Sequence, residues 1–181
     1  MRKFKYNPVA RECGSIEKRH KWFPIKCECC GNKVLEYVDG LFFVDRKPVG
    51  VFCLDCIATG RVAREFNGSF IFNYEKGIVK DKMKIDELTK RTPGYHAYSG
   101  MFWLACCEDF CEYLGETTPE FLDELGIFDE VVDECDSEFL VNENGVLDKE
   151  TIRDSMGDFV IAHLFRCLHC GKYRLYIELN L

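Results

Sequence analysis

The chain has 181 residues, of which 31 are acidic and 24 are basic, so its formal net charge is −7 at neutral pH. This balance argues against nucleic-acid binding, because nucleic-acid readers display a basic surface for phosphate contacts. No apolar run approaches the roughly 20 residues that cross a bilayer, so we expect no membrane association.

Residues 1–66 are predicted to hold a first zinc module. An extended N-terminal arm leads to Cys27 and Cys30, and Gly31 follows directly. Glycine adopts a positive φ without steric cost, as a turn that aims two sulfurs at one ion requires. We therefore expect a zinc knuckle at this position.

A hairpin and a short helix are predicted to complete this module. Residues 34–38 and 41–44 flank Asp39–Gly40, a dipeptide favoured in tight hairpin turns. Cys53 and Cys56 then occupy the first turn of a helix, where free N–H groups stabilise thiolates. A knuckle, a hairpin and a cysteine pair at a helix start are the layout of a treble-clef finger.

The middle of the chain contains two predicted elements and one ambiguous segment. Residues 70–74 alternate as in a strand, and residues 85–89 form a short helix. Residues 99–114 fit a helix that places Cys107 and Cys111 on one face. They also fit two strands that meet at a loose knuckle between these two cysteines.

Acidic residues are concentrated between residues 116 and 158, a stretch that contains 15 Asp or Glu residues and only two basic residues. A helix capped by Thr117 and Glu120 is predicted here. Its apolar stripe consists of Phe121, Leu125, Phe128 and Val132. The acidic block is either a solvated face or a binding surface for a basic protein, because concentrated charge steers association.

The chain closes in a predicted hairpin of residues 165–167 and 173–179 around a last knuckle, Cys167–Gly171. Residues 85–181 are thus a helical, acidic region closed by a second zinc module. The predicted fold class is α+β, as one small zinc-stapled domain over residues 1–181. We expect treble-clef or zinc-ribbon-like knuckles, β-hairpins and several short helices.

Twelve cysteines fall mostly into close pairs, and four such pairs provide the eight ligands of two tetrahedral Zn(Cys)4 sites. The predicted ligands are Cys27, Cys30, Cys53, Cys56, Cys107, Cys111, Cys167 and Cys170. The pairing of these pairs into two sites stays open. Cys29 and Cys106 each adjoin a predicted ligand and can replace it.

Two alternatives to structural zinc are disulfides and catalytic thiols. Disulfide-dense chains are usually short secreted domains, and the N-terminus shows no secretory h-region, so we expect a reducing cytoplasm. A zinc- or thiol-dependent enzyme of unknown substrate is the second functional class, centred on His96, Cys106 and Asp109. No His-x-x-x-His or deaminase signature supports it.

Several blocks of the sequence resemble the CbrC family of bacterial proteins. They are Phe4-Lys5-Tyr6 with Pro8, Cys27 to Gly31, Cys53 to Ala58 with Phe66 to Phe70, Arg91-Thr92-Pro93-Gly94-Tyr95, Trp103-Leu104 with Cys107 and Cys111, and Leu164 to Lys172. The resemblance implies that the eight predicted ligands form a shared set. The chain departs from the family pattern at Cys106, where that family commonly has His.

The resemblance to CbrC proteins also implies tolerance or immunity toward a colicin-type toxin. Together with the acidic block, it predicts a zinc-binding bacterial protein that acts by protein interaction. The expected partner is a basic protein, such as a nuclease toxin.

Overall fold

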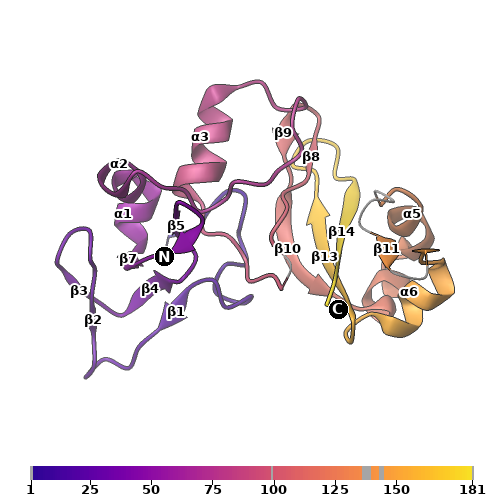
Figure 1. Ribbon diagram of the computed structural model, residues 1–181, viewed down its shortest axis with the longest axis horizontal. Helices are drawn as coiled ribbons and strands as arrows, with labels where there is room; N and C mark the ends of the chain where they lie inside the picture. The colour runs from indigo at the N-terminus through magenta and orange to yellow at the C-terminus, as the bar shows by residue number, and fades with distance from the viewer. Residues whose placement is uncertain (1, 99, 136–139, 143–144, 181) are drawn as a thin grey trace.

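The computed structural model describes residues 2–98, 100–135, 140–142 and 145–180. It is an elongated molecule with an N-terminal module at one end, a three-stranded sheet near the middle and short helices at the other end (Figure 1). The described elements are β1 (Glu17–Lys18), β2 (Ile25–Lys26), β3 (Lys33–Val34), β4 (Glu36–Asp39), β5 (Phe43–Val44), β6 (Lys47–Pro48), β7 (Val51–Cys53), α1 (Leu54–Ala58), α2 (Arg61–Phe66), α3 (Lys82–Arg91), β8 (Ala105–Cys106), β9 (Asp109–Phe110), β10 (Glu112–Thr117), α4 (Pro119–Glu124), α5 (Phe128–Asp133), β11 (Val141–Asn142), β12 (Gly145–Val146), α6 (Lys149–Ser155), β13 (Val160–Arg166) and β14 (Tyr173–Leu179).

This mixture of small sheets and short helices confirms the α+β character predicted from the sequence. Within the described part of the chain, no helix is long and apolar enough to span a membrane. The predicted strand over residues 70–74 is wrong, because this segment forms only one isolated bridge, between Tyr74 and Trp103.

The N-terminal module is built on a sheet in the order β1-β4-β7, followed by α1 and α2. The predicted hairpin around Asp39–Gly40 is wrong. Strand β4 pairs antiparallel with β7, placing Tyr37 opposite Cys53, while β5 and β6 form a separate small hairpin in the intervening loop. The helix predicted at the second cysteine pair is present as α1, with Cys53 as its N-cap.

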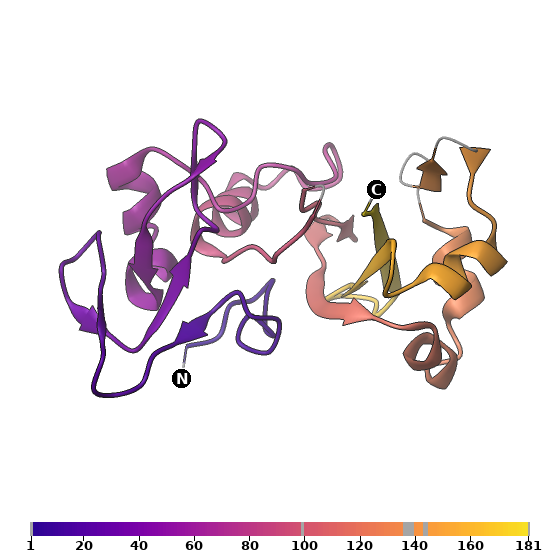
Figure 2. The ribbon, with the colours of Figure 1, turned by 60° about the horizontal axis from the view of Figure 1, so that its bottom comes forward.

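Helix α3 lies between the N-terminal module and the central sheet and contacts α1, α2 and β9 (Figures 1 and 2). It extends the short helix expected over residues 85–89 by about a turn. The ambiguous segment 99–114 follows the strand alternative, since β8, β9 and the start of β10 replace the single helix.

The central sheet has the order β10-β13-β14 and buries both of its faces. Phe165 and Tyr176 on one face join the principal core, which extends into the N-terminal module. Leu175 and Ile177 on the other face pack against the helical region that contains α4, α5 and α6. The sheet is therefore an inner layer: along β14, Tyr176 and Glu178 are buried as well as Leu175 and Ile177, and Arg174 is half-buried.

The helical region differs from the predicted apolar stripe. Helix α4 is capped by Thr118, whose Oγ1 accepts a hydrogen bond from the Phe121 N–H, one residue later than predicted. Phe121 is 47% exposed and Leu125 is 38% exposed. The chain turns at Gly126 before α5 begins, so the face that one continuous helix would bury is divided between two helices.

Candidate metal centres

The structure gathers eight cysteines into two groups of four, and in each group the Sγ atoms lie within 4.8 Å of one another. The N-terminal cysteine group consists of Cys27, Cys30, Cys53 and Cys56. The C-terminal cysteine group consists of Cys106, Cys107, Cys167 and Cys170. All twelve cysteines of the chain are unbridged.

The sulfur spacing in both groups matches tetrahedral metal coordination. Four sulfurs at about 2.3 Å from one ion lie about 3.8 Å from one another. The Sγ atoms of Cys30 and Cys53 are 3.8 Å apart, and Cys106 Sγ lies 3.7 Å from Cys107 Sγ and 3.8 Å from Cys170 Sγ. Each group therefore has the chemistry and the spacing to hold one ion.

The first knuckle is a tight turn closed by backbone hydrogen bonds. The Gly31 N–H donates to the Cys27 carbonyl at 2.8 Å, and the Cys27 N–H donates to the Asn32 carbonyl at 2.9 Å. Gly31 has a φ of 77°, which explains the glycine after the second cysteine. The Cys53 N–H at the start of α1 donates to Cys27 Sγ at 3.2 Å.

The last knuckle repeats this backbone pattern at the other end of the chain. The Gly171 N–H donates to the Cys167 carbonyl at 3.1 Å, the Cys167 N–H donates to the Lys172 carbonyl at 2.8 Å, and Gly171 has a φ of 75°. The N–H groups of His169 and Cys170 donate to Cys167 Sγ at 3.4 and 3.5 Å. Two distant segments therefore form the same sulfur-presenting turn.

The partner of the last knuckle is the β8–β9 hairpin, in which Cys106 pairs with Asp109 across a two-residue turn. The turn residues Cys107 and Glu108 have φ values of 52° and 58°. Successive residues of a strand point to opposite faces, but this turn brings the two adjacent sulfurs together. Positive φ is uncommon for residues other than glycine, so the hairpin is locally strained.

Cys111 does not lie where the sequence predicted it, among the metal ligands. It lies outside the C-terminal cysteine group, and Cys106 stands in its place. Cys111 is fully buried in the principal core, where its carbonyl accepts a hydrogen bond from Trp103 Nε1 at 2.9 Å. Burial raises the pKa of the Cys111 thiol to about 12.

Cys29 also lies outside the two groups. Its thiol donates a hydrogen bond to the Glu65 carboxylate at 3.3 Å.

Of the residues named for the enzyme hypothesis, Cys106 and Asp109 are neighbours across the hairpin. His96 instead lines a separate cavity of about 440 Å³ with Cys13.

In each group one thiol has a lowered pKa: Cys27 in the N-terminal group and Cys167 in the C-terminal group. Burial alone would raise the pKa of Cys167, but the N–H groups of Cys170 and His169 lower it to about 6. Burial likewise opposes the lowered pKa of Cys27, which results from N–H donors that include Cys53. Burial raises the pKa of Cys56 to about 12. A divalent cation would displace the proton that a thiol with such a raised pKa retains.

Asp109 connects the C-terminal cysteine group to distant parts of the chain. Its buried carboxylate accepts hydrogen bonds from Tyr6 Oη at 2.8 Å and Lys5 Nζ at 3.0 Å, and it lies 3.0 Å from His169 Nε2. Lys84 of α3 also lies within ion-pair distance, at 3.3 Å. Burial alone would raise the pKa of Asp109, but the hydrogen bonds from His169, Lys5 and Tyr6 hold it well below its usual range.

Sequence reasoning missed the structural role of this carboxylate. The five residues come from four segments that lie far apart in the sequence, and no single motif joins them. The nearest signal is the position of His169 inside the last knuckle and of Asp109 two residues after Cys107. Together these contacts fix the N-terminal arm and α3 beside the candidate metal site.

The fold and the two cysteine groups define a mixed α/β protein with two possible metal centres. A family model described as an uncharacterised protein family, UPF0167, matches residues 1–179, and the chain belongs to this family. The chain is 30% identical over 176 residues to the UPF0167 protein PA1536 of Pseudomonas aeruginosa, covering 93% of this chain and 92% of that protein. It is 25% identical over 187 residues to the UPF0167 protein Mb2317 of Mycobacterium bovis, covering 97% and 91%. No solved structure matches this chain.

The family assignment corrects the resemblance drawn from the sequence. The matching family and both of these relatives carry the name UPF0167, so the assignment to the CbrC family is wrong. The toxin tolerance that the CbrC resemblance implied has no further basis in these comparisons.

Proposed function

We propose that this chain is a structural zinc protein with two Zn(Cys)4 sites. The observation that carries the proposal is the near-tetrahedral spacing of the sulfurs in both groups. The Sγ atoms of Cys30 and Cys53 are 3.8 Å apart, and Cys106 Sγ lies 3.7 to 3.8 Å from those of Cys107 and Cys170. Four thiolates in tetrahedral geometry are the ligand set of zinc or of iron. The nearby Asp109 carboxylate already pairs with two lysines, Lys5 at 3.0 Å and Lys84 at 3.3 Å, so the donor set for an ion consists of the sulfurs.

The N-terminal module supports a treble-clef interpretation of this proposal. A knuckle, an antiparallel β4–β7 pair and a helix that begins after Cys53 occur in that order, and both cysteine pairs meet in one group. The last knuckle meets a hairpin instead of a helix, as in a zinc ribbon.

The ligand set favours a structural role for the metal over catalysis. Catalytic zinc sites keep one position for water or substrate, whereas four thiolates complete the tetrahedral shell. Each group also joins segments that are distant in the sequence, such as residue 27 with 56 and residue 106 with 170. The metals would therefore hold these distant segments together.

Elemental analysis and absorption spectroscopy of the purified protein test this proposal. We expect about two zinc ions per chain and no visible absorption from iron-thiolate bonds. Sulfur ligands near 2.3 Å with no light ligand should appear in X-ray absorption at the zinc edge. Protein purified under reducing conditions that contains neither zinc nor iron, or that carries iron instead, would contradict it.

The acidic helical region is the proposed surface for a basic protein partner. Glu124 and Glu130 are exposed and form no ion pair with the residues that the structure describes. Phe121 and Leu125 are exposed on the same helical segment, so apolar area lies among the carboxylates. Protein interfaces combine such an apolar centre with a charged rim that steers association.

Part of this surface is already neutralised. Lys149 pairs with Asp129 and Asp133, and Arg153 pairs with Asp123. Asp136, Glu138 and Glu143 lie outside the described residues. The proposal therefore rests on the unpaired carboxylates of α4 and α5.

Charge reversal tests the partner proposal. Cross-linking in the native cells identifies the partner, and its association rate is then measured with the purified proteins. Glu124→Lys with Glu130→Lys should slow association about tenfold at low salt, and the difference should shrink as salt screens the charges. The matched control is Glu12→Lys with Asp39→Lys, which makes the same charge change at exposed positions outside the helices. Equal slowing by both pairs would contradict a role for the acidic surface.

A further inference from the structure

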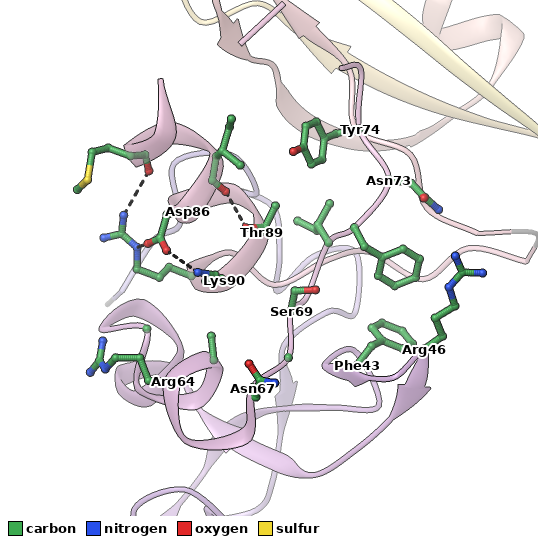
Figure 3. Close-up of a pocket in the computed structure, with 18 of the residues that line it drawn as sticks. Phe43, Arg46, Arg64, Asn67, Ser69, Asn73, Tyr74, Asp86, Thr89 and Lys90 are labelled. Carbon is green, nitrogen blue, oxygen red and sulfur yellow. Dashed lines mark hydrogen bonds and ion pairs between the residues drawn. The ribbon is translucent and has the colours of Figure 1, made fainter. Parts of the chain in front are cut away.

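A cleft of about 1060 Å³ lies between the N-terminal module and α3. Its walls come from α2, the β5–β6 hairpin, residues 67–74 and α3, and neither cysteine group lines it (Figure 3). This volume is in the range of small-molecule sites in proteins. The proposed metal-dependent role does not use this cleft.

The cleft concentrates positive charge in an acidic protein. Its lining contains five basic side chains against Asp45 and Asp86, although the whole chain carries a net charge of −7. These basic residues are Arg46, Arg64, Lys76, Lys90 and Arg91. Such a local reversal of sign points to an anionic ligand.

Three of these cations form no ion pair with the described residues: Arg46, Lys76 and Arg64, whose Nη1 donates to the Thr59 carbonyl at 2.9 Å. Lys90 and Arg91 both pair with Asp86, at 3.2 and 3.0 Å. Arg46 and Lys76 are exposed and form no ion pair within the described part of the chain. These cations can therefore meet a phosphate group without displacing a protein carboxylate.

Aromatic side chains line the same cleft, and one of them lies beside Arg46. Phe43 and Phe72 meet edge to face, with ring centroids 5.5 Å apart and an interplanar angle of 87°. Phe72 remains 41% exposed, and Tyr74 also lines the cleft. Figure 3 shows Arg46 next to the Phe43 ring, on the opposite side of the cleft from Arg64 and Lys90. Exposed aromatic faces next to cations are stacking platforms for nucleobases.

We propose that this cleft binds a nucleotide, with its base against Phe72 and its phosphate on the unpaired cations of the lining, Arg46 first among them. The polar side chains of Asn67, Ser69 and Asn73 line the same cleft and offer hydrogen bonds to the base or sugar. A free nucleotide fits better than a nucleic-acid chain, because the net charge of −7 repels an extended polyanion. The ligand chemistry is therefore a phosphate joined to a flat heteroaromatic ring.

Titration calorimetry of the metal-loaded protein tests this site with four probes: AMP, adenosine, inorganic phosphate and a short single-stranded oligodeoxynucleotide. We expect AMP to bind more tightly than either adenosine or phosphate, because only AMP engages both the cations and the ring. Arg46→Gln with Lys76→Gln should weaken AMP at least about tenfold. Phe72→Leu should reduce the advantage of AMP over inorganic phosphate.

Matched controls separate the cleft from general electrostatics. Lys47→Gln and Lys80→Gln remove exposed cations that neighbour the tested positions in sequence but do not line the cleft. Equal weakening by this control pair, equal binding of AMP and phosphate, or no binding of AMP would each overturn the proposal. Tighter binding of the oligonucleotide than of AMP would also overturn it, because the ligand would then be a nucleic-acid chain and not a free nucleotide.

Discussion

The ligand identity of the C-terminal cysteine group can be tested by comparing Cys106→Ser with Cys111→Ser. Cys106 Sγ lies at tetrahedral distances from two sulfurs of that group, whereas Cys111 is buried in the core outside it. Structural zinc binds with an apparent free energy of roughly 10–16 kcal/mol, or about 3 kcal/mol for each of four ligands. Loss of Cys106 should therefore weaken zinc binding about 100-fold or more.

Cys111→Ser should act on folding and leave the metal bound. It places a hydroxyl where the thiol packs in the core, at a cost of about 1–3 kcal/mol in the free energy of unfolding. Zinc content is measured after challenge with a chelator of intermediate affinity, and stability is measured by urea unfolding. Cys13→Ser, which changes a partly buried thiol outside both groups, is the control and should retain two ions. The reasoning is refuted if Cys111→Ser loses one zinc while Cys106→Ser retains both.

Three further predictions concern the parts of the chain that surround the metal sites. Cys170→Ser should increase hydrogen exchange in both the β8–β9 hairpin and the last knuckle, because one ion would hold both segments; loss of protection in the knuckle alone would contradict a shared site. Asp109→Asn should lower the free energy of unfolding by about 3 kcal/mol in urea titrations, because Lys5 and Lys84 lose their buried counter-charge; a change below about 0.5 kcal/mol would show that water replaces the carboxylate fully. Leu122→Ala should cost about 2–5 kcal/mol, whereas Phe121→Ala should cost less than about 1 kcal/mol in the same assay, and equal costs would mean that the α4 stripe predicted from the sequence packs after all.

Local signals in the sequence predicted local structure well. Gly31 and Gly171 both have positive φ and close the two knuckles as expected from the cysteine-glycine order. The helix start at Cys53 follows from the free N–H groups that a thiolate uses there. In each case the determining contacts lie within a few residues, so the pattern contains the necessary information.

The choice between Cys106 and Cys111 could not be made from spacing. Adjacent cysteines in a strand point to opposite faces, so spacing favours Cys107 and Cys111 as the convergent pair. The structure instead places Cys107 and Glu108 in a turn with positive φ, a conformation that residues other than glycine rarely adopt. Metal binding by Cys107 offers a physical reason for this strain, because the bond to the ion would offset it.

Long-range pairing also exceeded what the sequence could predict. Asp39–Gly40 has the residues of a hairpin turn, and Gly40 does have a positive φ, but β4 pairs with β7 beyond the intervening β5–β6 hairpin. The basic cleft is a similar case, because Arg46 and Lys76 are 30 residues apart in a chain whose net charge is negative. Composition averages over the surface, whereas a binding site depends on which side chains the fold brings together.

The two candidate metal sites would make different contributions to the fold. In the N-terminal module, strands of two to four residues and helices of five and six residues are too short to be stable alone, so a metal there would supply much of the ordering free energy. The central sheet has two seven-residue strands with both faces buried, so its core does not depend on an ion. A metal in the C-terminal cysteine group would instead fix the β8–β9 hairpin, and through Asp109 it would also position the N-terminal arm and α3. Because α3 forms one wall of the basic cleft, the position of that wall is linked through Lys84 and Asp109 to the candidate metal site.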